Sequence, residues 1–231
     1  MPKFNWAAAR LGLLAVIFVG TTATWAKLSA TPKMANSEGT PTASKPLATT
    51  VPLPNWQLVA TQPLKLDESQ GGQRYRYQQN GTTLEIDAHQ MVSDGNVSRY
   101  LFVHSPVRTA NANLNVKFQP NIGYYGLVSV ENKAYLSACI NPRGESTVTE
   151  QQFTQNLYTH DLRPARILPW LMGQESLIDY RCLWILMSVP IGNPPTPSST
   201  ERATLEAKAY QDLETAWFAW SQWWRSHFPP S

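Results

Sequence analysis

The sequence predicts an α+β domain: an antiparallel sheet with packed helices that ends in a long C-terminal amphipathic helix and follows an N-terminal membrane anchor or signal. Three observations predict it. Residues 71–92 and 122–140 alternate apolar and polar side chains around short turns, as antiparallel hairpins do. Residues 201–228 repeat apolar side chains every three or four positions, as a helix with one buried face does. Residues 1–26 join a basic flank to an apolar run.

Residues 1–26 are predicted to be a signal-anchor or a signal peptide. Lys3 and Arg10 precede a charge-free stretch of 16 residues from Leu11 to Ala26, which is shorter than the roughly 20 residues of a full membrane span. The alanines before Arg10 extend this stretch if the arginine side chain reaches the lipid headgroups, and cleavage after Ala26 is the alternative. The preceding positive charges predict a periplasmic domain, either anchored in the inner membrane or released from it.

Residues 27–52 are rich in Ser, Thr, Ala and Pro and show no apolar period, so they are predicted to be a disordered linker. Residues 53–231 are long enough for one extracytoplasmic domain with its own core. The net charge of +3 comes from basic residues scattered along the chain, so no nucleic-acid partner is expected. The sequence lacks metal-ligand spacings and cofactor motifs, so neither a metal nor a cofactor is expected.

The first half of the domain is predicted to hold two hairpins. Residues 55–66 begin as a strand, and the hairpin of 71–92 turns at Asn80-Gly81, where both positions tolerate a positive φ. Asp94 fits as the cap of a short helix whose inner side is Val97, Leu101 and His104, and a strand over Ser98–His104 fits nearly as well. Residues 105–115 fit a loop. The second hairpin turns near Glu131-Asn132. Its second strand alternates between two faces, with Ala134, Leu136, Ala138 and Ile140 on one and Tyr135, Ser137 and Cys139 on the other.

The second half is predicted to hold helices and one buried strand. A capping box of Thr149 and Gln152 starts a helix that runs from Glu150 to about Tyr158. In residues 161–173 an aspartate cap, an internal proline and a final glycine delimit another apolar segment. The nearly continuous apolar run of 181–191 is typical of a strand covered on both faces.

The final helix is predicted from Glu201 to about Phe228, with one apolar stripe that packs on the sheet. Trp223 and Phe218 fall off this stripe and are the better candidates for a partner contact. The stripe consists of Leu205, Ala209, Leu213, Trp217, Trp220, Trp224 and Phe228.

The stretch "CINPRGESTVT", residues 139–149, concentrates the candidate site residues. In one interpretation it is structural, because Asn-Pro forces a turn, a glycine allows a positive φ and the hydroxyls feed the next helix. In another it is a binding loop, in which Arg143 and nearby backbone N–H groups hold a carboxylate or phosphate. The candidate binding residues are Asn141, Arg143, Gly144, Ser146, Thr147 and Thr149.

The arginines Arg163, Arg166 and Arg181 are secondary candidates, as neighbours of Arg143 in the fold. The alternative is that these arginines form ion pairs with the protein's own carboxylates. The candidate carboxylates are those of Glu145, Glu150, Asp161 and Asp179.

Cys139 and Cys182 are the two cysteines of the chain. In an exported domain two cysteines favour one disulfide, and two buried free thiols are the alternative. A catalytic interpretation would make Cys139 a nucleophile with His104 or His160 as its base, although nothing in the local sequence brings either histidine to it.

The stretches "YLSACINPRGESTVTEQQF" and "DYRCLW" resemble the cyanoexosortase A system-associated proteins, small exported accessory proteins of a bacterial sorting system. The similarity is most specific over Cys139–Phe153, and residues 84–100 fit more loosely. One departure is Glu145, which stands where a small residue is expected and puts a negative charge beside Arg143. The residues that carry the likeness are Cys139, Asn141, Pro142, Arg143, Gly144, Ser146, Thr147 and Thr149, with Asp179, Arg181, Cys182, Leu183 and Trp184 in the second patch.

The resemblance implies a partner, either a multi-span membrane exosortase, thought to process proteins with a short C-terminal sorting tail, or those sorted substrates. It implies no catalytic residues, so the bond-breaking chemistry is expected in the exosortase and this chain is expected to act by binding. On the residues alone two other functions stay open. One is a cysteine-dependent hydrolase or transferase that uses Cys139, and the other is a module that binds an anionic lipid or glycan at Arg143.

Overall fold

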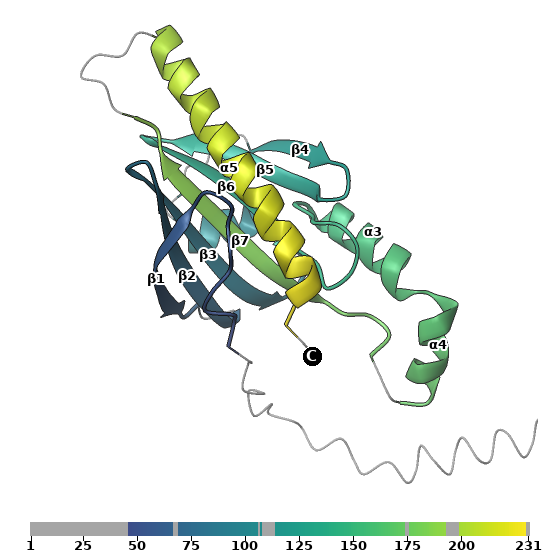
Figure 1. Ribbon diagram of the computed structural model, residues 1–231. Helices are drawn as coiled ribbons and strands as arrows, with labels where there is room; N and C mark the ends of the chain where they lie inside the picture. The colour runs from purple at the N-terminus through teal and green to yellow at the C-terminus, as the bar shows by residue number, and fades with distance from the viewer. Residues whose placement is uncertain are drawn as a thin grey trace, which may run out of the picture. The chain divides into compact units, whose positions relative to one another are not determined.

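The computed structural model describes residues 46–231 except 67–68, 106, 108–113, 174–175, 193–198 and 230–231. The predicted anchor at 1–26 and the predicted linker up to residue 45 lie outside the described residues. The described chain forms one antiparallel sheet of seven strands in the order β1-β2-β3-β7-β6-β5-β4, with helices packed on it (Figure 1). The predicted α+β class is therefore confirmed. None of the described helices is long and apolar enough to cross a membrane.

The first three strands form one half of the sheet: β1 (Gln57–Leu64), β2 (Ser69–Gln79) and β3 (Thr82–Val92). The predicted hairpin turn is confirmed, since Asn80 and Gly81 have φ values of 47° and 79°, as a type I′ turn requires. One face of the hairpin carries fully buried tyrosine and aliphatic side chains, and the other carries the ion pair between Arg74 and Asp87 at 2.6 Å.

The other half contains β4 (Asn115–Gln119), β5 (Gly123–Val130), β6 (Lys133–Ile140) and β7 (Arg181–Pro190). β7 lies between β3 and β6 and is buried along nearly its whole length, which confirms the strand predicted from the apolar run. The turn at Glu131-Asn132 is also confirmed. β4 was not predicted, because its polar and apolar residues alternate over only five positions. All five residues are exposed at the sheet edge.

α2 (Val97–His104) is a helix, and Val97, Tyr100 and Leu101 are its buried residues. The predicted Asp94 cap is wrong by two residues, since Asn96 caps the helix by accepting the N–H of Arg99. Gly95 has a positive φ of 67° and keeps Asp94 outside the helix, where its carboxylate accepts the N–H of Asn96 at 3.0 Å.

α3 (Glu150–Asp161) begins with the predicted capping box and runs three residues beyond the predicted end at Tyr158. Asp161 therefore ends α3 and does not cap the next helix, α4 (Pro164–Leu171). That helix starts at a proline and has no side-chain cap. Gly173 follows with a φ of 71°, as expected for a helix stop.

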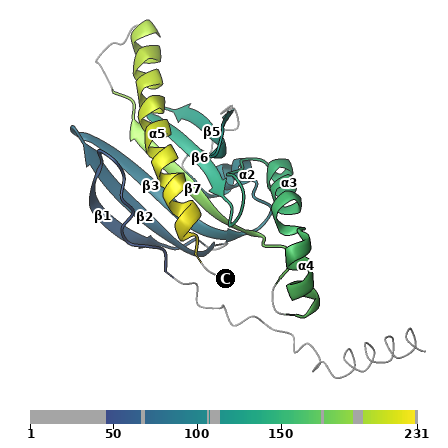
Figure 2. The same cartoon turned by 45° about the vertical axis from the view of Figure 1, so that its right-hand side comes forward.

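α5 (Ser199–His227) crosses the sheet over β6 and β7, as both views show (Figures 1 and 2). The predicted stripe is confirmed from Ala209 to Trp224, whereas Leu205 is partly buried and Phe228 lies beyond the end of the helix. The ring of Trp220 meets that of Tyr75 edge-on at 5.0 Å. The indole N–H groups of Trp217, Trp220 and Trp224 have no acceptor among the described residues. The buried residues of α5 are Ala209, Leu213, Ala216, Trp217, Trp220, Ser221 and Trp224.

The packed domain begins earlier than the predicted boundary at Leu53. Leu47 and Val51 are buried, and the hydroxyl of Tyr77 donates to the carbonyl of Val51 at 2.7 Å. The last part of the predicted linker is therefore part of the core. This stretch is rich in Ser, Thr and Pro and has no apolar period, so the burial of Leu47 and Val51 was not predicted.

Trp217→Ala should lower the free energy of unfolding by about 3–5 kcal/mol, because it leaves a cavity under α5. Trp217→Phe should cost less than half as much, since Phe fills most of the space and carries no unpaired N–H. Urea unfolding followed by circular dichroism measures both. Lys208→Ala, whose side chain is 70% exposed, is the control and should change stability by less than about 0.5 kcal/mol. Equal losses for Trp217→Ala and Lys208→Ala would contradict the buried stripe.

Candidate functional site: the 139–149 loop

The loop after β6 folds back on the sheet and is fixed by backbone hydrogen bonds on two sides. Cys139 and Thr147 exchange two of these bonds, at 2.8 and 2.9 Å. Ser146 donates its N–H to the carbonyl of Ile122 and accepts the N–H of Tyr124, both at 2.9 Å. The loop is therefore a short extension of the sheet that bridges β5 and β6, and its backbone is not free to reshape around a ligand.

The polar side chains of the loop bind the protein itself. The amide of Asn141 donates to the carbonyl of Glu145 at 2.7 Å, and the hydroxyl of Ser146 lies 2.9 Å from the carbonyls of Ile122 and Tyr124. Thr149 accepts the N–H of Gln152 at 3.2 Å and so caps α3. These contacts are the ones that the structural interpretation of the loop requires.

Gly144 lies against α3 with a φ of 77°, and a Cβ there would collide with Asn156 and His160. Asn156 ties the loop to α3, since its amide donates to the carbonyl of Arg143 at 2.8 Å and its side-chain oxygen accepts the N–H of Glu145 at 3.3 Å. The sequence pattern did not single out Asn156, because an asparagine inside a helix carries no local signal for a contact with a preceding loop.

Cys139 and Cys182 form a disulfide, with their Cα atoms 5.6 Å apart. Cys139 pairs across the strands with Trp184, two residues along β7 from Cys182, so both side chains lie on the same sheet face. Both cysteines are buried. The disulfide alternative is thus what the structure contains, and Cys139 has no thiol for the catalytic interpretation.

The two histidines proposed as bases, His104 and His160, make other contacts. The ring of His104 lies 6.3 Å from that of Trp184, measured between centroids. His160 packs against Gly144, and its Nδ1 is 2.9 Å from the Nη2 atom of Arg163. Among the described contacts, Arg163 approaches His160 and the carbonyl of Thr159, whereas the other candidate arginines approach aspartates.

A cluster of arginines and aspartates lies beside the loop, which we call the arginine–aspartate network. The Nε atom of Arg143 lies 2.9 Å from Asp161, and its Nη1 atom lies 3.6 Å from Asp179. Arg166 approaches Asp161 at 2.8 Å, and Arg181 approaches Asp179 at 2.7 Å. The structure thus brings Arg166 and Arg181 close to Arg143, but through shared carboxylates.

The network has three positive and two negative side chains, and its carboxylates are shielded from water. The side chain of Asp161 is only 3% exposed, and it also accepts the N–H of Asp179 at 2.8 Å. Burial acts to raise the pKa of Asp179, but hydrogen bonds and charge from Arg181, with the charge of Arg143, outweigh it and hold that pKa below its usual value. The ion-pair alternative therefore describes Arg143, with Asp161 and Asp179 as its partners.

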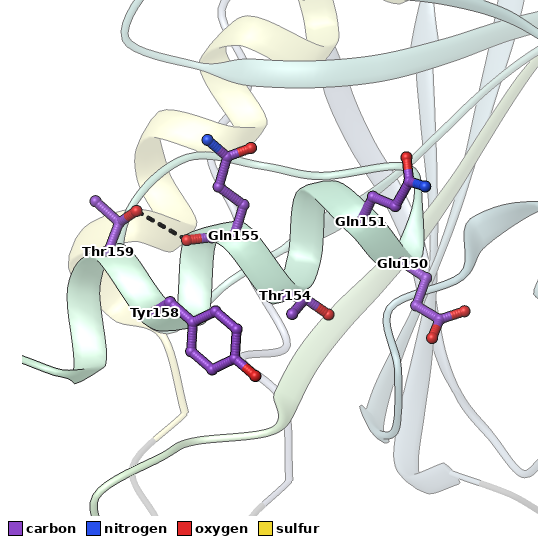
Figure 3. Close-up of a pocket in the computed structure, with 6 residues that line it drawn as sticks. All are labelled: Glu150, Gln151, Thr154, Gln155, Tyr158 and Thr159. Atoms are coloured by element: carbon purple, nitrogen blue, oxygen red, sulfur yellow. Dashed lines mark hydrogen bonds between the residues drawn. The ribbon is translucent and has the colours of Figure 1, made fainter.

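A shallow hollow of about 660 Å³ runs along the outer side of α3. All of its lining residues lie on this one helix, and their side chains do not converge on a common point (Figure 3). None of them belongs to the predicted site. The lining residues are Glu150, Gln151, Thr154, Gln155, Tyr158 and Thr159.

The remaining candidate, Trp223, is half-buried near the end of α5. Its ring stacks on His227 with 4.0 Å between centroids and meets Trp224 edge-on at 4.8 Å. Over the described residues, no three His, Cys, Asp or Glu side chains are grouped so that they could hold a metal ion.

Replacing both cysteines by alanine should lower the free energy of unfolding by about 4 kcal/mol, because the bond closes a loop with a sequence separation of 43. A reductant should cause a similar loss in the wild-type chain. Chemical unfolding with and without reductant measures this, and the double alanine variant, on which reductant has no bond to act, is the control. Two titratable thiols in the oxidised wild type, with no effect of reductant, would contradict the bond.

Asp179→Asn should lower stability by about 1–3 kcal/mol near pH 7, since it removes the charge that faces Arg181. Because the folded-state pKa of Asp179 is depressed, its contribution is complete above the unfolded value of about 3.9 and is lost as the pH falls through the folded value. The difference between wild type and variant should therefore shrink below about pH 4. Asp212→Asn on α5 is the exposed control, and a difference for Asp179→Asn that stays constant with pH would refute the role of its charge.

Similarity to known proteins adds no family assignment to this geometry. No family model, no curated protein and no solved structure matches the chain. The likeness to the cyanoexosortase A system-associated proteins therefore rests on the residues of the two patches alone.

Proposed function

We propose that this chain is a membrane-tethered extracytoplasmic accessory protein of an exosortase-type sorting system, which acts by binding the exosortase or its substrates. The observation that carries the proposal is the meeting of the two sequence patches that resemble such accessory proteins. Residues 139–149 and 179–184 are joined by the Cys139–Cys182 disulfide and by the ion pairs of Asp179 with Arg143 and Arg181. The residues that carry the resemblance are therefore neighbours in the folded domain.

The disulfide also supports the location. Such bonds form and persist in oxidising compartments and are rare in the cytoplasm. Combined with the basic flank and apolar run at residues 1–26, a buried disulfide favours a domain that folds after export. The predicted anchor would then keep the domain close to a membrane-embedded enzyme.

The geometry of the loop favours binding over catalysis. A cysteine nucleophile must be a free thiolate within reach of a base, whereas Cys139 is fully buried and bonded to Cys182. An anion-binding function at Arg143 has less support, because its guanidinium already faces Asp161 and Asp179. Neither alternative has an observation of its own that favours it.

Recovery of the exosortase with this protein tests the proposal. The full-length tagged chain should co-purify an exosortase or a protein with a C-terminal sorting tail from crosslinked membranes of its native host. Deleting the gene should impair processing of the tailed proteins. The matched control is residues 1–52 fused to an unrelated exported domain, which keeps the tether and should recover neither partner. Normal sorting in the deletion strain, with no recovery above that control, would refute the function.

A further inference from the structure

α4 exposes apolar side chains that a soluble domain normally covers. Leu168, Leu171 and Met172 are 63%, 67% and 64% exposed, and Trp170 is 46% exposed. No residue of this helix is buried in the described structure. We call these four side chains the α4 apolar surface. Leu168, Leu171 and Met172 are three and four positions apart and share one side of the helix, whereas Trp170 projects from the other side. Exposed apolar side chains of this size mark a binding site for another apolar phase or molecule.

The helix is held in place from its polar side. Arg166 reaches Asp161 at 2.8 Å and donates to the carbonyl of Ser176 at 2.8 Å. Through Asp161 it is tied to Arg143 and the 139–149 loop. Arg166 therefore ties α4 to the domain, while the side chains of the α4 apolar surface are exposed to solvent.

α4 lies at the end of the domain where the tether enters. Pro46 and Leu47, the first described residues, line a hollow of about 470 Å³ with residues 63–66 and 69–73. At this same sheet end Ser69 pairs with Met91, and Met91 pairs with Cys182 at the start of β7. Arg181 begins β7 and joins the arginine–aspartate network that holds α4. Figures 1 and 2 both show the start of the described chain, α4 and the C-terminus at one end of the domain.

The composition around α4 suits a lipid surface. The twelve residues of 162–173 contain two arginines and no acid, and their apolar side chains include a tryptophan, the residue enriched where membranes meet water. Asp161, which precedes this stretch, is buried and paired with arginines, and Glu175, three residues after Met172, lies outside the described residues. Arg166 is paired with Asp161, so the exposed Arg163 supplies the cationic side chain that an interfacial helix places beside its apolar ones.

The chain length beyond the described domain favours the same occupant. The predicted anchor ends at residue 26, and 19 residues, 27–45, separate it from Pro46. Even fully extended, 19 residues span no more than about 65 Å. A tether of this length keeps the α4 apolar surface within reach of the bilayer that would hold the anchor.

We infer that α4 is a membrane-contact helix that inserts the α4 apolar surface into the headgroup region of the bilayer in which the chain is anchored. This inference rests on the membrane tether of the proposed function. It goes beyond it by giving the domain a second, non-covalent contact with lipid. Two contacts, one through the tether and one through α4, fix the orientation of the domain, which a single tether leaves free.

Fluorescence quenching in proteoliposomes tests this. The full-length chain carries one engineered cysteine, Leu171→Cys, labelled with an environment-sensitive dye, since the native cysteines are bonded and buried. The liposomes contain phosphatidylcholine, phosphatidylglycerol and a nitroxide-labelled lipid. The matched control is Ala207→Cys on the exposed side of α5, near Glu206, which binds Ser129 in β5 at the other sheet end. Dye at 171 should be quenched severalfold more than dye at 207.

A second variant set separates contact from mere proximity. Replacing both Leu168 and Trp170 by glutamate in the Leu171→Cys chain should reduce quenching to the level at 207, with the thermal unfolding midpoint unchanged because these side chains are exposed. Equal quenching at 171 and 207 in a chain that floats with liposomes would overturn the inference and leave the tether intact. A chain that does not float with liposomes would overturn both.

Other occupants would give different signals, each against the inference. Dye at 171 that is shielded without lipid quenching, and becomes exposed on dilution, would indicate a second copy of the chain. Dye that is exposed in liposomes but shielded in native membranes would indicate a protein partner on the α4 apolar surface.

Discussion

One buried carboxylate, that of Asp161, determines how the second half of the domain is assembled. It lies at the end of α3, contacts Arg143 from the loop and Arg166 from α4, and accepts the backbone N–H of Asp179 just before β7. A buried charge is costly unless it is paired and hydrogen-bonded, so these four segments are constrained to meet at this point. The direction of α4 away from the sheet follows from this single requirement.

The same requirement explains why the 139–149 loop has the residues of an anion-binding loop although its contacts are with the protein itself. Arginine, glycine and hydroxyl residues are the types that bind anions, but here the anions are the protein's own aspartates and backbone carbonyls. The disulfide and the arginine–aspartate network connect the loop to β7 and α4. The exposed apolar side chains of α4 are the clearest surface feature of these connected segments.

The sequence predicted those features whose cause is local. The turn at Asn80-Gly81 and the capping box of Thr149 and Gln152 depend on residues within four positions of each other, and both are present. β4 escaped prediction because its exposed residues are ordered only by pairing with β5. The role of Asp161 was misjudged for a related reason. An aspartate ahead of an apolar helical segment is typical of a helix cap. The partners of Asp161 instead come from loop and helix residues that no local pattern connects.

The sequence named the arginines of the candidate site and four carboxylates that could pair with them. The folded chain shows that Arg143, Arg166 and Arg181 gather around two of these four, Asp161 and Asp179. The exposure of the apolar side chains of α4 could likewise not be predicted from the sequence. An apolar run with periodic side chains predicts a buried face, and whether another element covers that face depends on the tertiary arrangement.

The bond between Cys139 and Cys182 encloses α3, α4 and the segment that leads into β7 within one covalent ring. A protease that cuts the chain once inside this ring, for example in the exposed stretch around Met172, leaves the two fragments attached to each other. The fragment that precedes the cut and the fragment that holds α5 then stay together. A single nick is consequently visible only under reducing conditions, and the protein resists loss by clipping at its most exposed helix.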